Sequence, residues 1–398
     1  MVKLGEVCSI ERGGSPRPIK DYITDSQEGL NWIKIGDTDP QGKYIYRTNE
    51  KIKPEGLKKT KWVEENDLLL SNSMSYGRPY ILKTNGCIHD GWLVIRDYQS
   101  SLNTDFFYYL LLSPIVQRQF LLKAQGSTVS NLNTQRVTDV NVLVPPLEEQ
   151  HRIVSILDAS FEKIDALKKN AEENLKNAKA LFQQVLAQEL KPKEGWGKYE
   201  LENICTNIID CPHSTPKKSD AITNYPCIRT SELRNGKIYW DSMQYLDKDE
   251  YEKRVVRLIP KEGDIVYGRE GTFGDAVLLP SGYNFSLGQR TMLLRPDTTI
   301  VYPEFLLITM ISPYVYKQAK DKNSGCGVGH VNVKDIKKFT IYLPDDISEQ
   351  HRIVRTLDTL SEKCSRLEQI AQQTICECDA LKQSILRQAF SGNYKKGR

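Results

Sequence analysis

Long apolar runs are missing from this chain of 398 residues. No segment approaches the roughly 18 consecutive apolar residues that a membrane-spanning helix needs, so we expect no membrane partner. The first residues, MVKLGEVCSIERGG, lack a basic stretch followed by an apolar run, which argues against a secretory signal. Both absences favour a cytoplasmic protein.

Paired cysteine motifs are also missing. The nine cysteines are an odd number with irregular spacing, and Cys376 and Cys378 have no second pair at zinc-finger distance. We therefore expect reduced thiols, most of them buried as small apolar groups, and no metal site.

Motifs for several enzyme chemistries are absent as well. An adenine methyltransferase needs a glycine-rich cofactor loop and an Asn/Asp-Pro-Pro-aromatic motif, whereas the only Pro-Pro pair here is Pro145-Pro146. No Gly-x-x-x-x-Gly-Lys-Ser/Thr loop is present, so ATP hydrolysis is not supported. We expect a chain that binds no cofactor and catalyses no reaction alone. The net charge of +4 does not by itself reveal a nucleic-acid-binding face.

An internal repeat organises the chain. Residues 149–154 and 349–354 both read EQHRIV, at an offset of half the chain, and LGEVC at 4–8 resembles LENIC at 201–205. The segments that flank the two globular interiors match between the halves, whereas residues 70–95 and 267–292 have almost no sequence similarity. This pattern favours one scaffold that displays two different surfaces. The repeat, together with the Gly and Pro residues that interrupt the helices, predicts six segments. They are a globular block 1–146, a helix 147–190, a linker 191–197, a second block 198–345, a helix 346–390 and a tail 391–398.

The segments that carry the EQHRIV repeat have a helical pattern. Residues 148–190 contain neither Gly nor Pro, and at 1.5 Å per residue each helix is roughly 60 Å long. Apolar residues recur every seven positions in both segments, which is typical of a coiled coil. The two helices are each other's obvious partner, and we expect them to run antiparallel. The seam positions are Leu157, Ile164, Ala171, Ala178 and Val185, with Phe161, Leu175 and Phe182 interleaved, and then Leu357, Cys364, Ala371, Cys378 and Ile385, with Leu360, Leu367, Thr374 and Leu381 interleaved.

The two globular blocks are mixed in character, so the predicted fold class is α+β. Each has one apolar stretch that predicts a helix interrupted by Ser-Pro, at 105–122 and at 304–319. Short β-rich runs are separated by Gly and Pro turns. These runs lie at 32–35, 67–70, 92–95, 140–144, 264–267, 291–294 and 339–343.

This layout resembles the specificity subunits of type I restriction-modification enzymes over essentially the whole chain. The resemblance rests on LGEVC, PPLEEQHRIVSILD, SEQHRIVRTLD and LKQSILRQAFSG. It implies two α/β target recognition domains, the blocks 1–146 and 198–345, each reading one half of a split site in double-stranded DNA. It also implies that the long helices form an antiparallel coiled coil with pseudo-two-fold symmetry. One departure is the end of the first helix, ALFQQVLAQEL, which matches LKQSILRQAFSG only loosely.

The resemblance further implies enzyme partners. Two modification subunits would dock on the helices, bind S-adenosylmethionine and methylate adenine. Restriction subunits, which are motor nucleases that use ATP and magnesium, would cut unmethylated DNA. The repeated motif supplies the candidate docking residues Glu149, Gln150, His151, Arg152, Glu349, Gln350, His351 and Arg352. For the two histidines we favour docking or helix capping over catalysis.

Candidate DNA-reading residues lie in polar and basic segments where the blocks diverge. Arg suits guanine, Asn and Gln suit adenine, and Lys suits phosphate. The candidates are Lys58, Lys59, Lys61, Asn72, Ser73, Tyr76, Arg78, His89 and Trp92 in the first block, and His213, Lys217, Lys218, Arg229, Tyr267, Arg269, Thr272, Gln289 and Arg290 in the second. Weaker phosphate candidates are Arg12, Arg17, Lys20 and Lys34. The alternative is that these segments are ordinary solvated loops.

The glycine-rich segment GCGVG at 325–329 resembles a nucleotide loop, but the following HVNV does not start a helix. We favour a flexible turn near the DNA, with GSTV at 126–129 as its counterpart, over a cofactor site. Two other functions stay open. The chain could be a stand-alone DNA-binding or architectural protein without enzyme partners, or a nuclease, although no paired carboxylates with a lysine at metal-site spacing are evident.

Overall fold

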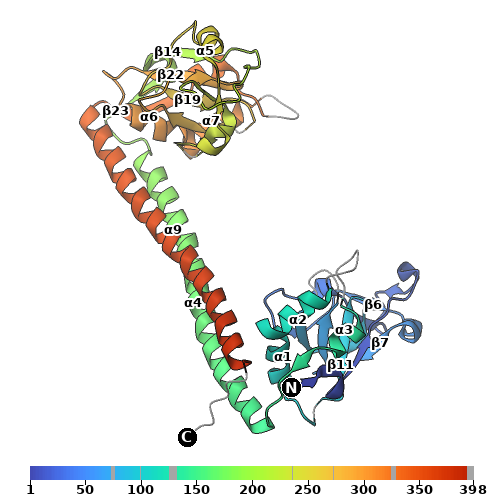
Figure 1. Cartoon of the computed structure of the whole chain (residues 1–398). Coiled ribbons are helices and arrows are strands. Elements are labelled where there is room, and N and C mark those ends of the chain that lie inside the picture. Colours follow the sequence, from blue (N-terminus) through green and yellow to red (C-terminus); the bar gives the residue numbers. More distant parts are fainter. Residues whose placement is uncertain are drawn as a thin grey trace. The chain divides into compact units, whose positions relative to one another are not determined.

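The computed structural model describes residues 1–72, 77–98, 100–124, 132–234, 236–271, 273–323 and 329–391. The chain forms two compact units, unit 1 (Met1–Glu172 and Gln372–Arg398) and unit 2 (Glu173–Ala371). Figure 1 labels their main elements. Two long helices, α4 (Leu147–Glu189) and α9 (Ile347–Ala389), each contribute to both units.

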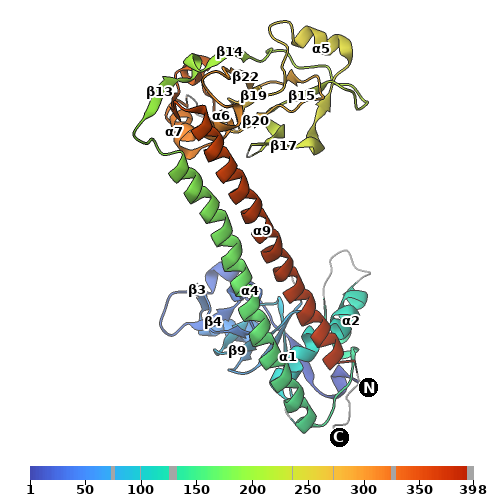
Figure 2. The ribbon, with the colours of Figure 1, turned by 90° about the vertical axis from the view of Figure 1, so that its left-hand side faces the viewer.

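The long helices pair in the antiparallel sense that the sequence predicts. Figures 1 and 2 both show α4 and α9 side by side. Within unit 1, Lys168 forms an ion pair with Asp379 at 2.7 Å, and Lys382 forms one with Asp165. Residue numbers therefore rise along one helix as they fall along the other.

The seam between the helices follows the predicted heptads and then shifts by one residue. The buried positions are Leu157, Ile164, Ala171, Ala178 and Leu186 in α4, and Leu357, Cys364, Ala371, Cys378 and Leu386 in α9. The prediction was wrong for Val185 and Ile385, which are only half-buried. A seven-residue repeat drifts by about 20° per heptad around a straight helix, so the later residue faces the partner after four heptads.

The predicted seam was also wrong at two of the interleaved positions of α9, Leu367 and Leu381. Leu367 and Leu381 are 51% and 49% exposed. Leu167 and Leu181, the repeat equivalents on α4, are 55% and 45% exposed. The helices therefore carry apolar residues outside their own seam.

Unit 1 is built from two main sheets and three short helices. Its strands pair in the orders β2-β11-β8-β9-β5, β3-β6-β4-β10-β7 and β1-β12. The elements are β1 (Val2–Lys3), β2 (Ser9–Arg12), β3 (Ile23–Thr24), β4 (Leu30–Ile33), β5 (Tyr44–Ile45), β6 (Glu50–Ile52), β7 (Lys61–Val63), β8 (Leu68–Ser71), β9 (Pro79–Leu82), β10 (Gly86–Ile88), β11 (Trp92–Arg96), α1 (Thr104–Leu112), α2 (Pro114–Ala124), α3 (Thr134–Thr138) and β12 (Asn141–Val142).

The central sheet of unit 1 is covered on both faces. Side chains alternate across a strand, so Leu68 and Leu70 of β8 join the core formed with α1, α2 and α4, whereas Leu69 joins the core between the two sheets. Burial on both faces explains why β8 reads as a continuous apolar run in the sequence.

Unit 2 repeats this plan. Its strands pair in the orders β14-β22-β19-β20, β18-β15-β21, β13-β23 and β16-β17. The elements are β13 (Trp196–Glu200), β14 (Cys205–Asp210), β15 (Pro226–Ile228), β16 (Leu233–Arg234), β17 (Lys237–Ile238), β18 (Gln244–Tyr245), α5 (Lys248–Arg254), β19 (Ile265–Gly268), β20 (Ala276–Leu278), β21 (Ser286–Leu287), β22 (Thr291–Pro296), α6 (Pro303–Met310), α7 (Pro313–Asp321), α8 (Val333–Lys337) and β23 (Thr340–Pro344).

The same alternation sorts the side chains of β19, because Ile265 and Tyr267 join the core with α6 and α7 while Val266 joins the core between the sheets. The predicted Ser-Pro interruptions are confirmed, since α2 begins at Pro114 and α7 at Pro313. Within the described ranges, no helix is both long and apolar enough to cross a membrane.

Candidate nucleic-acid interface

The strand β8 ends beside a segment in which the two halves of the chain diverge. Asn72, the next residue, donates its backbone N–H to the carbonyl of Gly91 at 2.9 Å. Its own carbonyl accepts from the backbone N–H of Leu132 at 3.0 Å. These two bonds fix the place where the divergent loop leaves the frame.

Unit 2 has the same pair of bonds at the end of β19. The backbone N–H of Arg269 donates to the carbonyl of Arg290 at 3.0 Å, and its carbonyl accepts from Val331 at 2.9 Å. Arg269 and Asn72 thus occupy equivalent backbone positions with different side chains.

An equivalent ion pair between two side chains also occurs in each unit. Arg96 bonds to Asp67 at 2.8 Å in unit 1, and Arg295 bonds to Asp264 at 2.7 Å in unit 2. The hydrogen bond to Asp264 raises the pKa of Arg295, so the guanidinium stays charged. Charged pairs of this kind anchor the strands below the divergent loops.

The divergent edge of unit 1 carries a hollow of about 600 Å³ that is lined by residues 15–19, His89 and Asp90. Asp90 lines this hollow, and its carboxylate accepts from the Ser15 hydroxyl at 2.9 Å and lies 3.0 Å from Nε2 of His89. Nδ1 of His89 accepts from the backbone of Gly91 at 3.0 Å, which leaves the ring proton on Nε2. Arg17 has a side chain that is 83% exposed and lies 3.8 Å from Asp90.

The corresponding edge of unit 2 presents other groups. The amide of Gln289 donates to the carbonyl of His213 at 3.2 Å and to the Thr215 hydroxyl at 3.1 Å. Arg290 has a left-handed backbone (φ 69°) and a half-exposed side chain 3.5 Å from Glu270. His213 is well exposed, with Asp210 3.5 Å away. An exposed Arg beside a held Gln can serve direct reading of base edges.

The prediction that Arg269 is displayed for contact with DNA was wrong, because only 6% of its side chain is exposed. Its guanidinium bonds to Asp210 at 2.9 Å and to Glu270 at 3.0 Å. His330 lies 3.0 Å from the same Glu270. The physical role of Arg269 is to hold loop carboxylates in place, not to lie on the surface.

Three further candidates are buried rather than displayed. Trp92 and Tyr267 have no exposed surface, and Asn72 is 1% exposed with its amide donating to the carbonyl of Asp90 at 2.9 Å. Arg78 is half-buried, donates to the carbonyl of Gly42 at 3.2 Å and lies over the ring of Tyr80. The three buried side chains therefore support the edge from inside, whereas Arg78 stays partly exposed.

The predicted lysines are exposed but differ in their surroundings. Lys59 contacts the Tyr22 hydroxyl at 3.0 Å and Lys61 contacts Glu11 at 2.9 Å. Lys58, Lys217 and Lys218 are exposed as well. Arg229 is half-buried and bonds to the fully buried Glu232 at 2.7 Å, which reduces its use as a phosphate contact. Ser73, Tyr76 and Thr272 lie outside the described residues, as do GSTV at 126–129 and 325–328 of GCGVG.

The repeated docking motif divides into two kinds of residue. Glu149 pairs with Arg152 at 2.7 Å, and Glu349 pairs with Arg352 at 2.7 Å, each within the first turn of its helix. His151 is exposed, whereas His351 is half-buried. The ring of His351 lies 3.7 Å from that of Tyr302. These side chains are partly or fully available on the helix surface.

The prediction that Gln150 and Gln350 are docking residues was wrong, because both side chains are fully buried. The Gln150 amide accepts from the backbone of Asn103 at 2.8 Å and donates to the carbonyls of Ser101 and Pro145 at 2.8 Å. Gln350 makes the equivalent bonds to the backbones of Tyr302, Ile300 and Pro344. The glutamine of EQHRIV therefore fastens each helix to its globular domain.

Arg254 was missed from the sequence. It is 6% exposed and donates to the carbonyls of Leu287, Ser214 and Pro212, which ties the loop after β14 to β21. Backbone carbonyls leave no mark in a sequence, so no motif could have revealed it. Across the parts of the chain that the structure describes, no group of three or more His, Cys, Asp or Glu could hold a metal ion.

Comparisons with known proteins identify the family. A model of the type I restriction modification DNA specificity domain matches residues 1–177 and 193–376. The specificity subunit of the type I restriction enzyme EcoBI from Escherichia coli is 23% identical, over 98% of this chain and 85% of that protein.

Solved structures agree in fold. One chain from a type I R-M system has a TM-score of 0.78 at 20% identity, covering 98% of this chain and 97% of that chain. The HsdS subunit from Thermoanaerobacter tengcongensis has a TM-score of 0.63 at 21% identity, covering 98% and 96%. Members of the matched family are DNA-recognition subunits without catalysis of their own. This chain belongs to the type I restriction-modification DNA specificity family and is a specificity subunit.

Proposed function

We propose that the two globular domains, 1–146 and 198–345, each read one half of a split target in double-stranded DNA. The observation that carries this proposal is the pair of equivalent backbone positions with different side chains, Asn72 and Arg269. A shared frame with different surfaces suits two different half-sites. The groups best placed for reading are the exposed Arg17, His213 and Arg290 and the half-buried His89 and Gln289.

The proposal includes the enzyme partners that membership of the family suggests. Two modification subunits bind S-adenosylmethionine and methylate adenine in each half-site, and restriction subunits use ATP and magnesium to cut unmethylated DNA. This chain holds neither cofactor and positions both kinds of subunit. The assembly works in the cytoplasm. The comparisons give no support to a stand-alone architectural role.

Methylome sequencing tests the proposal. A host strain would express this chain with its modification subunit, and genomic adenine methylation would be mapped. The expected result is one motif with two short defined halves separated by an unread spacer. A continuous motif, or no motif despite a stable complex, would contradict the proposal.

A further inference from the structure

The turn between β21 and β22 in unit 2 lies at the divergent edge and is held at several points. The backbone N–H of Gly288 donates to the carbonyl of Ile228 at 2.7 Å, and the Thr291 hydroxyl donates to the carbonyl of Gly288 at 2.8 Å. The amide of Gln289 donates to two groups in the segment 213–215. Because these bonds already fix the turn, little conformational entropy is lost when a ligand binds to it.

Arg290, within this turn, has a left-handed backbone with a φ of 69°. This conformation is unfavourable for side chains other than those of Asn and Asp. In the described ranges, the other non-glycine residues with a positive φ are Asn66 and Asp97, which are types that tolerate it. Glycine would fit the backbone of Arg290 without strain, so the turn itself gives no reason for an arginine. Strained residues of this kind cluster at functional sites.

The equivalent position in unit 1 is occupied by a glycine. The backbone N–H of Asn72 donates to the carbonyl of Gly91, and that of Arg269 donates to the carbonyl of Arg290. Gly91 and Arg290 therefore take the same place relative to the strand that precedes the divergent loop, and only Arg290 has a side chain. The arginine is thus a feature of one domain rather than of the shared scaffold.

The side chain of Arg290 is oriented by Glu270 and is 54% exposed. Its Nε lies 3.5 Å from Oε2 of Glu270, while Oε1 of the same carboxylate lies 3.0 Å from Arg269 and 3.0 Å from His330. Among the residues that the structure describes, none forms a hydrogen bond with Nη1 or Nη2 of Arg290. The two terminal nitrogens of the guanidinium are therefore available to a ligand.

Two parallel N–H groups at the end of an arginine match two neighbouring acceptors. In the major groove guanine presents such a pair, O6 and N7, whereas adenine presents one acceptor beside a donor. Phosphate oxygens can also accept both bonds, but phosphate contacts carry no sequence information, and both domains need them alike. An arginine that stands in one domain, at a position where the other has glycine, fits a base contact better.

We propose that Arg290 is a specificity-determining residue of the domain 198–345 and reads a guanine in its half-site, with Glu270 as a positioning residue. The inference rests on the proposed reading of one half-site by each domain. It adds the base that this position of the second domain selects.

The test uses the full chain with its modification subunit and maps the methylated motif in a host strain. In Arg290→Gly, one guanine of the motif should be replaced by any base, with discrimination at that position falling at least about fivefold. All other positions in both halves should stay. Thermal stability should not fall, because glycine adopts the left-handed backbone without strain. Arg290→Lys should relax the same position, because an ammonium group cannot make the bidentate contact.

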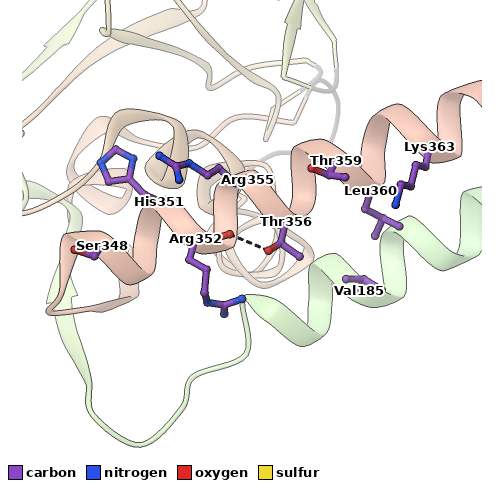
Figure 3. A pocket seen from close by; sticks show the side chains of 9 residues that line it. All are labelled: Val185, Ser348, His351, Arg352, Arg355, Thr356, Thr359, Leu360 and Lys363. Atoms are coloured by element: carbon purple, nitrogen blue, oxygen red, sulfur yellow. Dashed lines mark hydrogen bonds between the residues drawn. The ribbon is translucent and has the colours of Figure 1, made fainter.

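Arg355→Ala is the control for the loss of one positive charge from unit 2. Arg355 is exposed on α9 and lines the pocket that Figure 3 shows, outside the turn of Arg290. Alanine is used there because glycine would weaken the helix. This substitution should leave every position of the motif unchanged, whatever it does to the amount of methylation.

Several results would overturn the inference. The motif of Arg290→Gly could be unchanged, or the relaxed position could be one that was not a guanine. An equal loss of affinity for all sequences, in a binding titration at fixed salt, would make Arg290 a phosphate contact. Relaxation of the same position in Arg355→Ala would reduce the effect to net charge, and a lower thermal stability with an intact motif would make Arg290 structural. A wild-type complex that methylated no two-part motif would refute the proposed function itself.

Discussion

Arg269 and Arg290 contact the same carboxylate, Glu270, from opposite environments. Arg269 is buried and lies 3.0 Å from it, while Arg290 is half-exposed and lies 3.5 Å from it. An arginine in a divergent polar loop can therefore have either of two roles: it can hold the loop in place, or it can be exposed for contact with DNA. Only packing separates a residue that holds the loop from one that can meet a base.

Substitution should separate the two roles. Arg290→Ala should lower affinity for the target by about 1–3 kcal/mol, the value of one good base contact, and leave thermal stability unchanged. Arg269→Ala should destabilise unit 2 by about 3 kcal/mol, because it leaves Asp210 and Glu270 without their partner. Calorimetry and a DNA-binding titration at fixed salt measure both quantities. A destabilised Arg290→Ala with normal DNA affinity would place Arg290 in the frame.

The buried glutamines allow a second test. Gln150→Ala should lower the free energy of unfolding by about 2–4 kcal/mol, because it leaves the backbone groups of Asn103, Ser101 and Pro145 without partners at a buried site. Gln350→Ala should do the same in unit 2. Gln184→Ala, at an exposed position on α4, is the control. If thermal unfolding of Gln150→Ala matched that of the control, water would be replacing the amide.

Cysteine chemistry gives a third prediction at this scale. Burial raises the pKa of Cys205 to about 12 and that of Cys87 to about 11, so these thiols remain protonated at neutral pH. Of the cysteines in the described ranges, Cys376 is the exposed one. Alkylation at pH 8 followed by peptide mapping should label Cys376 before the other seven cysteines of the described ranges. Faster labelling of Cys205 or Cys87 would show that their sites open in solution.

Elements with strong local signals could be predicted from the sequence. The absence of Gly and Pro between 148 and 190 indicates α4, and Ser-Pro marks the break between α1 and α2. The sequence pattern alone did not predict that the seam shifts to Leu186, because this shift comes from the drift of a seven-residue repeat around a straight helix. The bonds of Gln150 and Arg254 could not be predicted, because their partners are backbone atoms, most of them distant in the sequence. Residue type and loop position selected the candidate DNA-reading residues, but they could not separate an exposed arginine such as Arg290 from a buried one such as Arg269.

At the scale of the molecule, the repeat predicts that recognition is modular. The segment 1–146 would be exchanged for the same segment of another specificity subunit, with Gln150 and the rest of α4 kept. One half of the methylated motif should change and the other should stay, because each frame carries its own side chains. The measurement is the methylome of the hybrid with its modification subunit. Changes in both halves of the motif, in a hybrid that folds, would show that the domains do not read independently.

The last prediction concerns the length of the long helices. Our hypothesis is that the coiled coil sets the unread spacer between the half-sites. Inserting four helix-forming residues near Leu181 adds about 6 Å of helix, and a coiled coil tolerates four residues as a stutter. DNA rises about 3.4 Å per base pair, so the spacer should lengthen by about one or two base pairs. Both half-site sequences should remain, because no reading residue has moved within its domain.

Methylome sequencing of the insertion variant with its modification subunit measures the spacer directly. The control places the same four residues in the linker at 191–197, where Gly195 and Pro192 already interrupt the helix. Because extra residues there add no helix, the spacer of the control should be unchanged. An insertion variant that folds and methylates with its original spacer would mean that the modification subunits, rather than α4 and α9, set the distance between the half-sites.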